Sequence, residues 1–124
     1  MRTPAQRAGD DAEARVAAHL EKLGWRVLAR QLRVGRAEID LLTLDPGPPP
    51  ALVIVEVRWR GRRDFGLPEE TVDHRKRGRL HAAGHALREA GRLPDRTPLP
   101  ALPLRFDLIV VEPGDRLRHH RHGA

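Results

Sequence analysis

The chain of 124 residues lacks several features that mark common classes of protein. It has no cysteine, which excludes disulfide bonds and metal sites built on thiolates. No apolar run approaches the roughly 18–20 residues that a membrane-spanning helix needs, and the first residues include no apolar segment typical of a signal peptide. We therefore expect a cytoplasmic protein without a membrane partner.

Aromatic residues and lysine are also scarce. Two Trp, two Phe and no Tyr argue against binding of single-stranded nucleic acid by base stacking. Lys and Arg together number 23 against 17 Asp and Glu, and the resulting net charge of +6 suits a polyanionic partner such as nucleic acid. Only Lys22 and Lys76 are lysines, so an Arg can stand here where a relative carries Lys.

The pattern of apolar residues predicts two helices and four strands. Helical spacing predicts the helices at residues 4–23 and 73–90. Alternating or continuous apolar runs predict strands at residues 25–34, 37–44, 51–60 and 104–112. The first three strands can form an antiparallel meander, and the last strand, reached through a helical crossover, then lies parallel to a neighbour.

These elements form one small α/β domain with a mixed central sheet, in the order α-β-β-β-α-β. The length allows a single domain with a modest core. We place this domain at residues 1–113. Residues 114–124 form a basic tail rich in His and Arg, which is either flexible or a short edge strand.

Three acids, Glu38, Asp40 and Glu56, lie in predicted strands that are otherwise almost wholly apolar. Carboxylates in such segments cost free energy unless something pairs with them. If the second and third strands form a hairpin centred on Pro48, Asp40 lies opposite Glu56, with Cβ atoms roughly 4.5–5.5 Å apart. Two carboxylates that close repel each other unless a proton or a cation lies between them. A divalent cation such as Mg²⁺, which takes oxygen ligands, would remove the repulsion.

An ordinary salt bridge is the other explanation for these acids. Side chains alternate between the two faces of a strand, so Arg58 is expected on the same face as Glu56, while Ile39 and Leu41 share the opposite face from Asp40. Arg58 could then neutralise both acids without a metal. The spacing of the residues leaves both interpretations open.

Four segments of the chain resemble a known group of proteins. The segments GRAEIDLL, VIVEVRWR, DFGLPEETVDHRKRGRL and LRFDLIVV occur in the order and spacing of the YraN-like proteins, an uncharacterised bacterial group. This group is similar to archaeal Holliday-junction resolvases and to restriction-endonuclease-like nucleases, and the resemblance covers residues 9–111. It implies a restriction-endonuclease-like fold and hydrolysis of phosphodiester bonds in duplex or branched DNA with Mg²⁺, or Mn²⁺, as cofactor. It also implies a possible homodimer, since a junction presents two related strands.

The nuclease pattern can be carried over to individual residues. It implies that Asp40 and Glu56 are metal ligands, that Glu13 is the acid on the first helix, and that Arg58 occupies the position of a catalytic Lys. Arg stays protonated and cannot act as a general base, although it can hold a phosphate through two parallel hydrogen bonds. Lys76 is a candidate to supply the missing amine. Its alternative role is to cover apolar surface with its stem while the ammonium group reaches water.

The run RWRGRRDFG predicts a basic loop after the proposed site. Its arginines Arg58, Arg60, Arg62 and Arg63 are candidates for contacts with DNA phosphates, which need only such donors. A solvated loop is the alternative. The same residues allow two further functions: a nucleic-acid-binding module that has lost catalysis, and a protein-interaction domain in which Arg58 ties the acids into a structural network.

Asp107 is a further acid in an apolar strand, the last one predicted. It shares its face of that strand with Arg105. We therefore predict a salt bridge between the two residues in preference to a catalytic role for Asp107.

Overall fold

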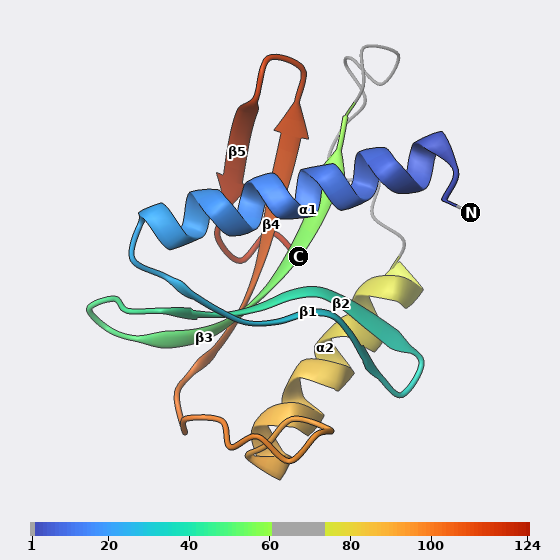
Figure 1. Ribbon diagram of the computed structural model, residues 1–124. Coiled ribbons are helices and arrows are strands. Elements are labelled where there is room, and N and C mark those ends of the chain that lie inside the picture. The colour runs from blue at the N-terminus through green and yellow to red at the C-terminus, as the bar shows by residue number, and fades with distance from the viewer. Residues whose placement is uncertain (1, 61–73) are drawn as a thin grey trace.

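A five-stranded sheet with one helix on each face forms the protein in the computed structural model, which describes residues 2–60 and 74–124. Figure 1 shows helix α1 crossing one face and helix α2 lying behind the sheet. The elements are α1 (Pro4–Lys22), β1 (Arg26–Val34), β2 (Ala37–Asp45), β3 (Ala51–Trp59), α2 (His74–Ala90), β4 (Leu104–Glu112) and β5 (Arg116–His120). No helix within these described residues is long and apolar enough to cross a membrane.

The strands lie in the order β1-β2-β3-β4-β5. The pairs β1–β2, β2–β3 and β4–β5 are antiparallel, whereas β3 and β4, joined through α2, are parallel. The predicted α/β domain with a mixed sheet is therefore confirmed. Strand β5 adds an antiparallel edge to β4 and comes from the segment 114–124, for which the sequence left an edge strand as one of two possibilities.

Helix α1 begins at a strong capping signal. The side chain of Thr3 accepts a hydrogen bond from the backbone N–H of Gln6, and the Gln6 side chain accepts one from the backbone N–H of Thr3. The helix buries Ala12, Val16, Ala17 and Leu20 against the sheet. The predicted helix extended to residue 23, but the helix ends at Lys22, and Leu23 is its C-cap and is 56% exposed.

Two apolar cores lie on the two faces of the sheet. The core under α1 contains Leu41, Val53 and Val55, and the core under α2 contains Ile39 and Ile54. The sequence placed Ile39 and Leu41 on the same face, and the structure separates them. Residues two apart on a regular strand share a face, so β2 is irregular at the residue between them, Asp40.

The neighbouring strand accounts for this irregularity. Strand β1 pairs through Arg30 with Leu41 and through Leu32 with Ile39, while Gln31, opposite Asp40, has a backbone φ of +48°. Such a value is rare for a residue other than Gly within a strand. Around this change of backbone direction, β2 places Ile39 and Leu42 in the core under α2 and Leu41 in the core under α1.

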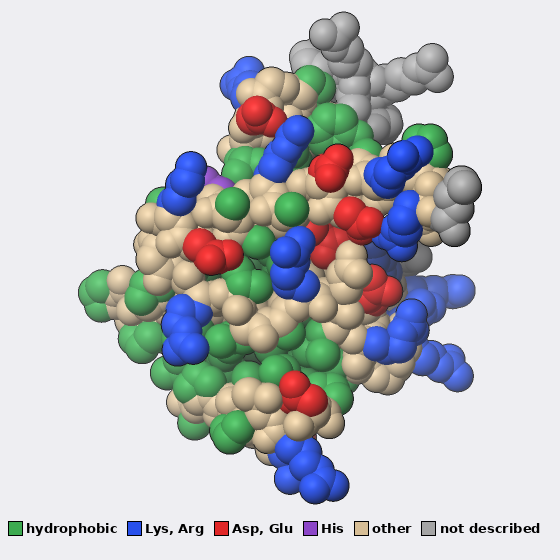
Figure 2. Space-filling model, viewed as in Figure 1, with side chains coloured by type: hydrophobic (Ala, Val, Ile, Leu, Met, Phe, Trp, Pro, Cys, Tyr) green, Lys and Arg blue, Asp and Glu red, His purple; other side chains and the backbone are tan. Residues whose placement is uncertain are grey.

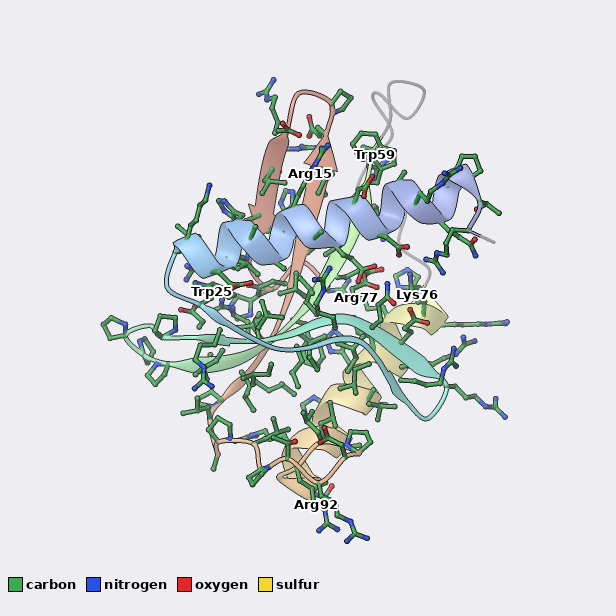
Figure 3. The ribbon with its side chains drawn as sticks, viewed as in Figure 1. Arg15, Trp25, Trp59, Lys76, Arg77 and Arg92 are labelled. Atoms are coloured by element: carbon green, nitrogen blue, oxygen red, sulfur yellow. The ribbon has the colours of Figure 1, made fainter. Side chains whose placement is uncertain are left out.

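The charged side chains are unevenly distributed over the surface. Figure 2 shows Lys and Arg side chains gathered at the right-hand edge of the view, where Figure 1 places the turn between β1 and β2 and the start of α2. Figure 3 shows Lys76 at this start of α2 and Arg92 beyond the far end of the same helix. The acids singled out from the sequence lie near the basic edge.

Candidate active site

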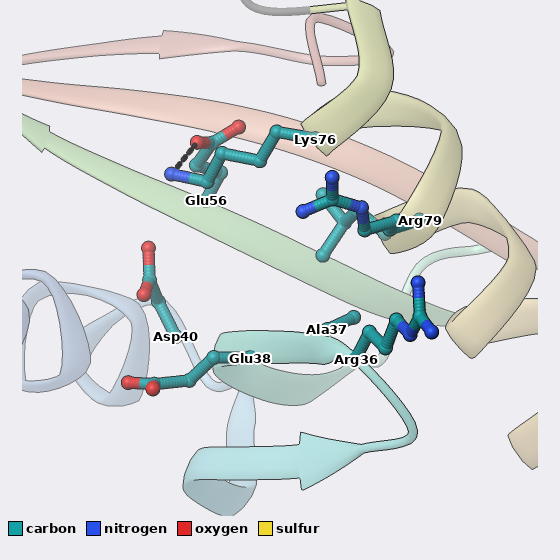
Figure 4. Close-up of a pocket in the computed structure, with 8 residues that line it drawn as sticks. Arg36, Ala37, Glu38, Asp40, Glu56, Lys76 and Arg79 are labelled. Atoms are coloured by element: carbon teal, nitrogen blue, oxygen red, sulfur yellow. Dashed lines mark ion pairs between the residues drawn. The ribbon is translucent and has the colours of Figure 1, made fainter.

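A pocket of about 400 Å³ lies where β2 and β3 meet the first turns of α2. Figure 4 shows the residues around it, which come from the β1–β2 turn, β2, β3 and α2. The lining residues are Arg36, Ala37, Glu38, Asp40, Glu56, Lys76, Arg79 and Leu80. The three acids that the sequence placed in apolar strands are thus gathered in one pocket, and Lys76 joins them.

Asp40 occupies the point where the pairing of β2 with β3 ends. The predicted register is confirmed from Asp45, which pairs with Ala51, to Leu41, which pairs with Val55. Beyond Leu41 the Oδ2 atom of Asp40 accepts a hydrogen bond of 2.9 Å from the backbone N–H of Val57. The carboxylate therefore replaces a backbone acceptor and is fixed at the opening between the strands, with Oδ1 as its second oxygen.

The surroundings of Asp40 make its ionised form costly. Burial is the main cause that raises its pKa, and the hydrogen bond from Val57 lowers it. The negative charges of Glu13 and Glu56 raise it further, while the charge of Lys76 lowers it. The net result is a pKa of about 6. In this environment a bound cation would stabilise the ionised form of Asp40.

Glu56 is buried and lies against two basic side chains. The Nζ atom of Lys76 is 3.1 Å from its Oε1 atom, and Nη2 of Arg58 is 3.7 Å from the same oxygen. Glu56 is 6% exposed, whereas the Lys76 side chain is 64% exposed. Lys76 therefore brings an ammonium group to the edge of the site. Arg58 lies beside Glu56, as expected for two residues on the same face of β3.

Glu13 approaches Asp40 from α1. Its Oε2 atom accepts a hydrogen bond of 3.5 Å from Gln31, which also donates to Asp10 at 3.1 Å, and its Oε1 atom is buried without a hydrogen-bond partner among residues 2–60 and 74–124. Burial raises the pKa of Glu13, against the effect of the Gln31 hydrogen bond. Sequence reasoning missed Gln31, because a Gln in a strand carries no signal of an unusual backbone.

The donor set suits Mg²⁺ better than a metal that needs a full cage of protein ligands. In the part of the chain that the structure describes, no three His, Cys, Asp or Glu residues are grouped closely enough to hold a metal ion. Mg²⁺, however, usually keeps several waters and binds through one or two carboxylates together with substrate phosphates. Asp40 and Glu56 provide two such carboxylates. The unpartnered oxygen of Glu13 is a further buried acceptor near them.

The arginines predicted to contact DNA have different surroundings. Arg58 pairs with Glu56, and Arg60 is buried at the end of β3, where its backbone N–H donates to Val111. Arg62 and Arg63 lie outside the described residues. The exposed arginines that line the pocket are instead Arg36 and Arg79, which sequence reasoning did not select.

The chain is similar to a known protein family over most of its length. The model of the uncharacterised protein family UPF0102 matches residues 12–111. The chain belongs to this family. The resemblance to YraN-like proteins seen in the sequence is thereby confirmed. The range that matches the UPF0102 model contains Glu13, Asp40, Glu56 and Lys76.

Relatives from distant bacteria are also described as UPF0102 proteins. A protein of Roseiflexus castenholzii is 38% identical over 110 residues, which cover 89% of this chain and 82% of the relative. One from Deinococcus radiodurans is 38% identical over 84% of this chain and 79% of its own length. A third, from Symbiobacterium thermophilum, is 39% identical over 88% of this chain and 85% of its own length. The similarity to UPF0102 proteins therefore extends over nearly the whole domain.

A second group of buried acids, away from the pocket, has a structural explanation. The predicted salt bridge of Asp107 is confirmed, since Nε and Nη2 of Arg105 donate to its two oxygens at 2.9 and 3.0 Å. His119 and the backbone N–H of His122 also contact Asp107, at 2.8 and 3.1 Å. Arg105 reaches Asp45 as well, at 3.0 Å. Both carboxylate oxygens of Asp107 thus accept hydrogen bonds within this network, which gives Asp107 a structural role.

Proposed function

We propose that this UPF0102 protein is a Mg²⁺-dependent endonuclease that hydrolyses phosphodiester bonds in duplex or branched DNA. The observation that carries the proposal is the approach of Glu13 from α1 and Glu56 from β3 to Asp40, close enough for both charges to raise the pKa of Asp40. Acids from these three elements, in this chain order, are what the resemblance to restriction-endonuclease-like nucleases implies.

Each side chain has a defined role in this proposal. Asp40 and Glu56 would hold the metal, with Asp40 fixed by its hydrogen bond from Val57. Glu13 would accept a hydrogen bond from water next to the metal through its unpartnered Oε1 atom. A bound Mg²⁺ supplies a lowered pKa for its water and a positive charge for the phosphate.

Lys76 and Arg58 would act on the phosphate. Both lie against Glu56, so a phosphate that enters beside this residue meets an ammonium and a guanidinium group. Neither group needs to remove a proton, because charge neutralisation and positioning provide most of the catalysis in phosphoryl transfer. The Arg at the position of the usual Lys is therefore compatible with activity when Lys76 lies beside it.

Cleavage of a labelled four-way junction tests the proposal, alongside linear duplex and single-stranded DNA, with Mg²⁺, with Mn²⁺ and with EDTA. We expect cleavage of the junction or the duplex that depends on the metal. Asp40→Asn removes one ligand charge and should lower the rate at least about 100-fold, while DNA binding stays intact or tightens as a negative charge is lost.

Asp11→Asn is the matched control, because Asp11 is an exposed acid on α1 outside the pocket. Its cleavage rate should equal that of the unmodified protein. Unchanged cleavage by Asp40→Asn would contradict the assignment of Asp40 as a metal ligand and would indicate a contaminating nuclease. Metal binding followed by calorimetry gives a readout independent of turnover, and it should weaken in Asp40→Asn but not in Asp11→Asn.

A DNA-binding module without catalysis is the second candidate. The pairing of Glu56 with both Lys76 and Arg58 favours it, because two cations already balance the charge that a metal would balance. This alternative predicts salt-dependent DNA binding that needs no Mg²⁺ and persists in EDTA, and no cleavage of any of the three substrates.

A further inference from the structure

The pocket carries charges of opposite sign in different parts. Asp40 and Glu56 lie where β2 and β3 separate, while Arg36 comes from the β1–β2 turn and Arg79 from α2. In Figure 4 the side chain of Arg79 extends from α2 towards the acids, and that of Arg36 rises from the turn towards α2. Both arginines therefore line the same pocket as the acids, and they come from two different elements.

Arg36 and Arg79 line the pocket without a paired acid, unlike Arg33 and Arg58 close to it. Arg33 lies 3.6 Å from Glu38, and Arg58 lies 3.7 Å from Glu56. The side chains of Arg36 and Arg79 form no ion pair or hydrogen bond with any of residues 2–60 and 74–124. Both are exposed. Two cationic side chains that line one pocket without a paired acid favour a bound anion there.

We propose that Arg36 and Arg79 form a phosphate-binding site that holds a second phosphate of the strand whose neighbouring phosphate lies at Asp40 and Glu56. This inference rests on the proposed function and adds the class of substrate. Guanidinium groups bind phosphates through pairs of parallel hydrogen bonds. A site for two phosphates selects a polynucleotide strand, so a mononucleotide or another phosphate monoester is a poor ligand.

Arg36 and Arg79 are each attached to a well-fixed part of the backbone. Arg36 follows Gly35, whose φ of +59° allows the tight turn between β1 and β2. Arg79 precedes Leu80, which is buried in the core under α2 and fixes this turn of the helix on the sheet. The two arginines are thus held by rigid elements, although their side chains extend into solvent.

DNA binding without metal tests the inference independently of cleavage. The probe is a fluorescein-labelled 20-base-pair duplex in EDTA, and its anisotropy is measured over 50–300 mM NaCl. The Arg36→Ala/Arg79→Ala variant should lower the magnitude of the slope of log K against log salt concentration by about 0.9, since the two arginines together hold one phosphate and each lost phosphate contact removes about 0.9. At 0.1 M salt its affinity should fall about tenfold or more.

Arg26→Ala/Arg92→Ala is a control of equal charge. Arg26 and Arg92 are exposed, Arg26 lies at the opposite end of β1 from the turn, and Arg92 follows the far end of α2 from Lys76. This variant should change the slope by less than about 0.5. If the alanine variant of the pocket fails to fold, Arg36→Gln/Arg79→Gln keeps most of each side chain and receives the same test.

Equal slopes for the pocket variant and the control variant would overturn the inference, as would a lack of salt-dependent binding by the unmodified protein. A competition assay adds a second decision: an unlabelled ten-nucleotide strand should displace the duplex, and deoxyadenosine monophosphate at the same nucleotide concentration should not. Equal competition by the two would overturn the two-phosphate site. A lower slope without any cleavage would support this site and contradict only the proposed endonuclease.

Discussion

Two groups of buried acids lie on the same sheet, and strand β2 contributes to both. Asp45, at the end of β2, belongs with Asp107 to a network in which Arg105 and His119 bind the carboxylates. Asp40, earlier on β2, lies with other acids in the pocket and has a pKa raised to about 6. The first group is fully paired, and the second is not.

The pKa values of Asp107 and Asp40 are shifted in opposite directions, and the cause is physical. Burial raises the pKa of Asp107, but the hydrogen bonds from His119, Arg105 and the backbone outweigh it, so the pKa lies below its ordinary value. At Asp40 a single backbone hydrogen bond opposes burial and two negative neighbours. Acids that stabilise the fold are fully bound, whereas acids that cost stability at neutral pH indicate a site kept for binding.

Removal of Arg105 should have the largest effect on stability. Arg105→Leu leaves Asp45 and Asp107 buried without their shared cation, and breaking a buried pair in this way costs about 3–5 kcal/mol. Urea unfolding at pH 7 measures the change. Arg26→Leu, at an exposed position, is the control and should cost less than about 0.5 kcal/mol. A loss below about 1 kcal/mol for Arg105→Leu would remove the distinction between the two groups.

A neutral residue at Asp40 should have the opposite effect. Asp40→Asn keeps an oxygen for the N–H of Val57 and removes a costly charge, so at pH 8 it should raise the free energy of unfolding by about 1–2 kcal/mol. Asp107→Asn, the matched change in the paired group, should lower it. Urea unfolding of both variants decides the matter, and destabilisation by both would mean that the two groups are equivalent.

The pH dependence should differ between the groups as well. The folded pKa of Asp40 is raised to about 6 from an ordinary 3.8, so its contribution is present below pH 3.8 and is lost as the pH rises through about 6. The folded pKa of Asp107 is lowered, so its contribution is present above its ordinary pKa of 3.8 and is lost as the pH falls through the folded value. Unfolding midpoints between pH 3 and pH 8 should show a loss above pH 4 that Asp40→Asn removes and Asp107→Asn retains.

Local patterns in the sequence predicted the parts of the site that local rules determine. Strand periodicity and the central turn at Pro48 sufficed to place Asp40 near Glu56, because a hairpin register follows from the turn and the apolar faces. The salt bridge between Arg105 and Asp107 followed from their spacing on one strand. Alternation failed at Ile39 and Leu41, because the left-handed backbone of Gln31 on the neighbouring strand has no signature in the sequence.

Contacts that form when the helices pack on the sheet could not be predicted from local sequence patterns. The approach of Lys76 to Glu56 and that of Glu13 to Asp40 depend on how α2 and α1 lie across the strands. The pocket arginines were hidden for another reason. In a chain with 21 arginines, the residue pattern gives no sign that Arg36 and Arg79 are the two that line the pocket.

The smallest effect on stability is expected at Lys76. This residue is best compared with Arg105. Both cations pair with buried carboxylates, but the Lys76 side chain is 64% exposed and that of Arg105 is 11% exposed. An exposed partner contributes only about 0–1 kcal/mol, and Arg58 remains beside Glu56. Lys76→Gln should therefore leave the urea midpoint nearly unchanged, as should Lys22→Gln, its control at the other lysine.

Cleavage then separates the roles of the two lysines. If Lys76 acts on the phosphate, Lys76→Gln should lower the cleavage rate at least about tenfold at unchanged stability, and Lys22→Gln should not. A loss of more than about 2 kcal/mol in Lys76→Gln would show that the ammonium group holds the fold as Arg105 does. The pair of Lys76 and Glu56 would then belong with the structural network, and the case for a phosphate-binding amine at this position would fail.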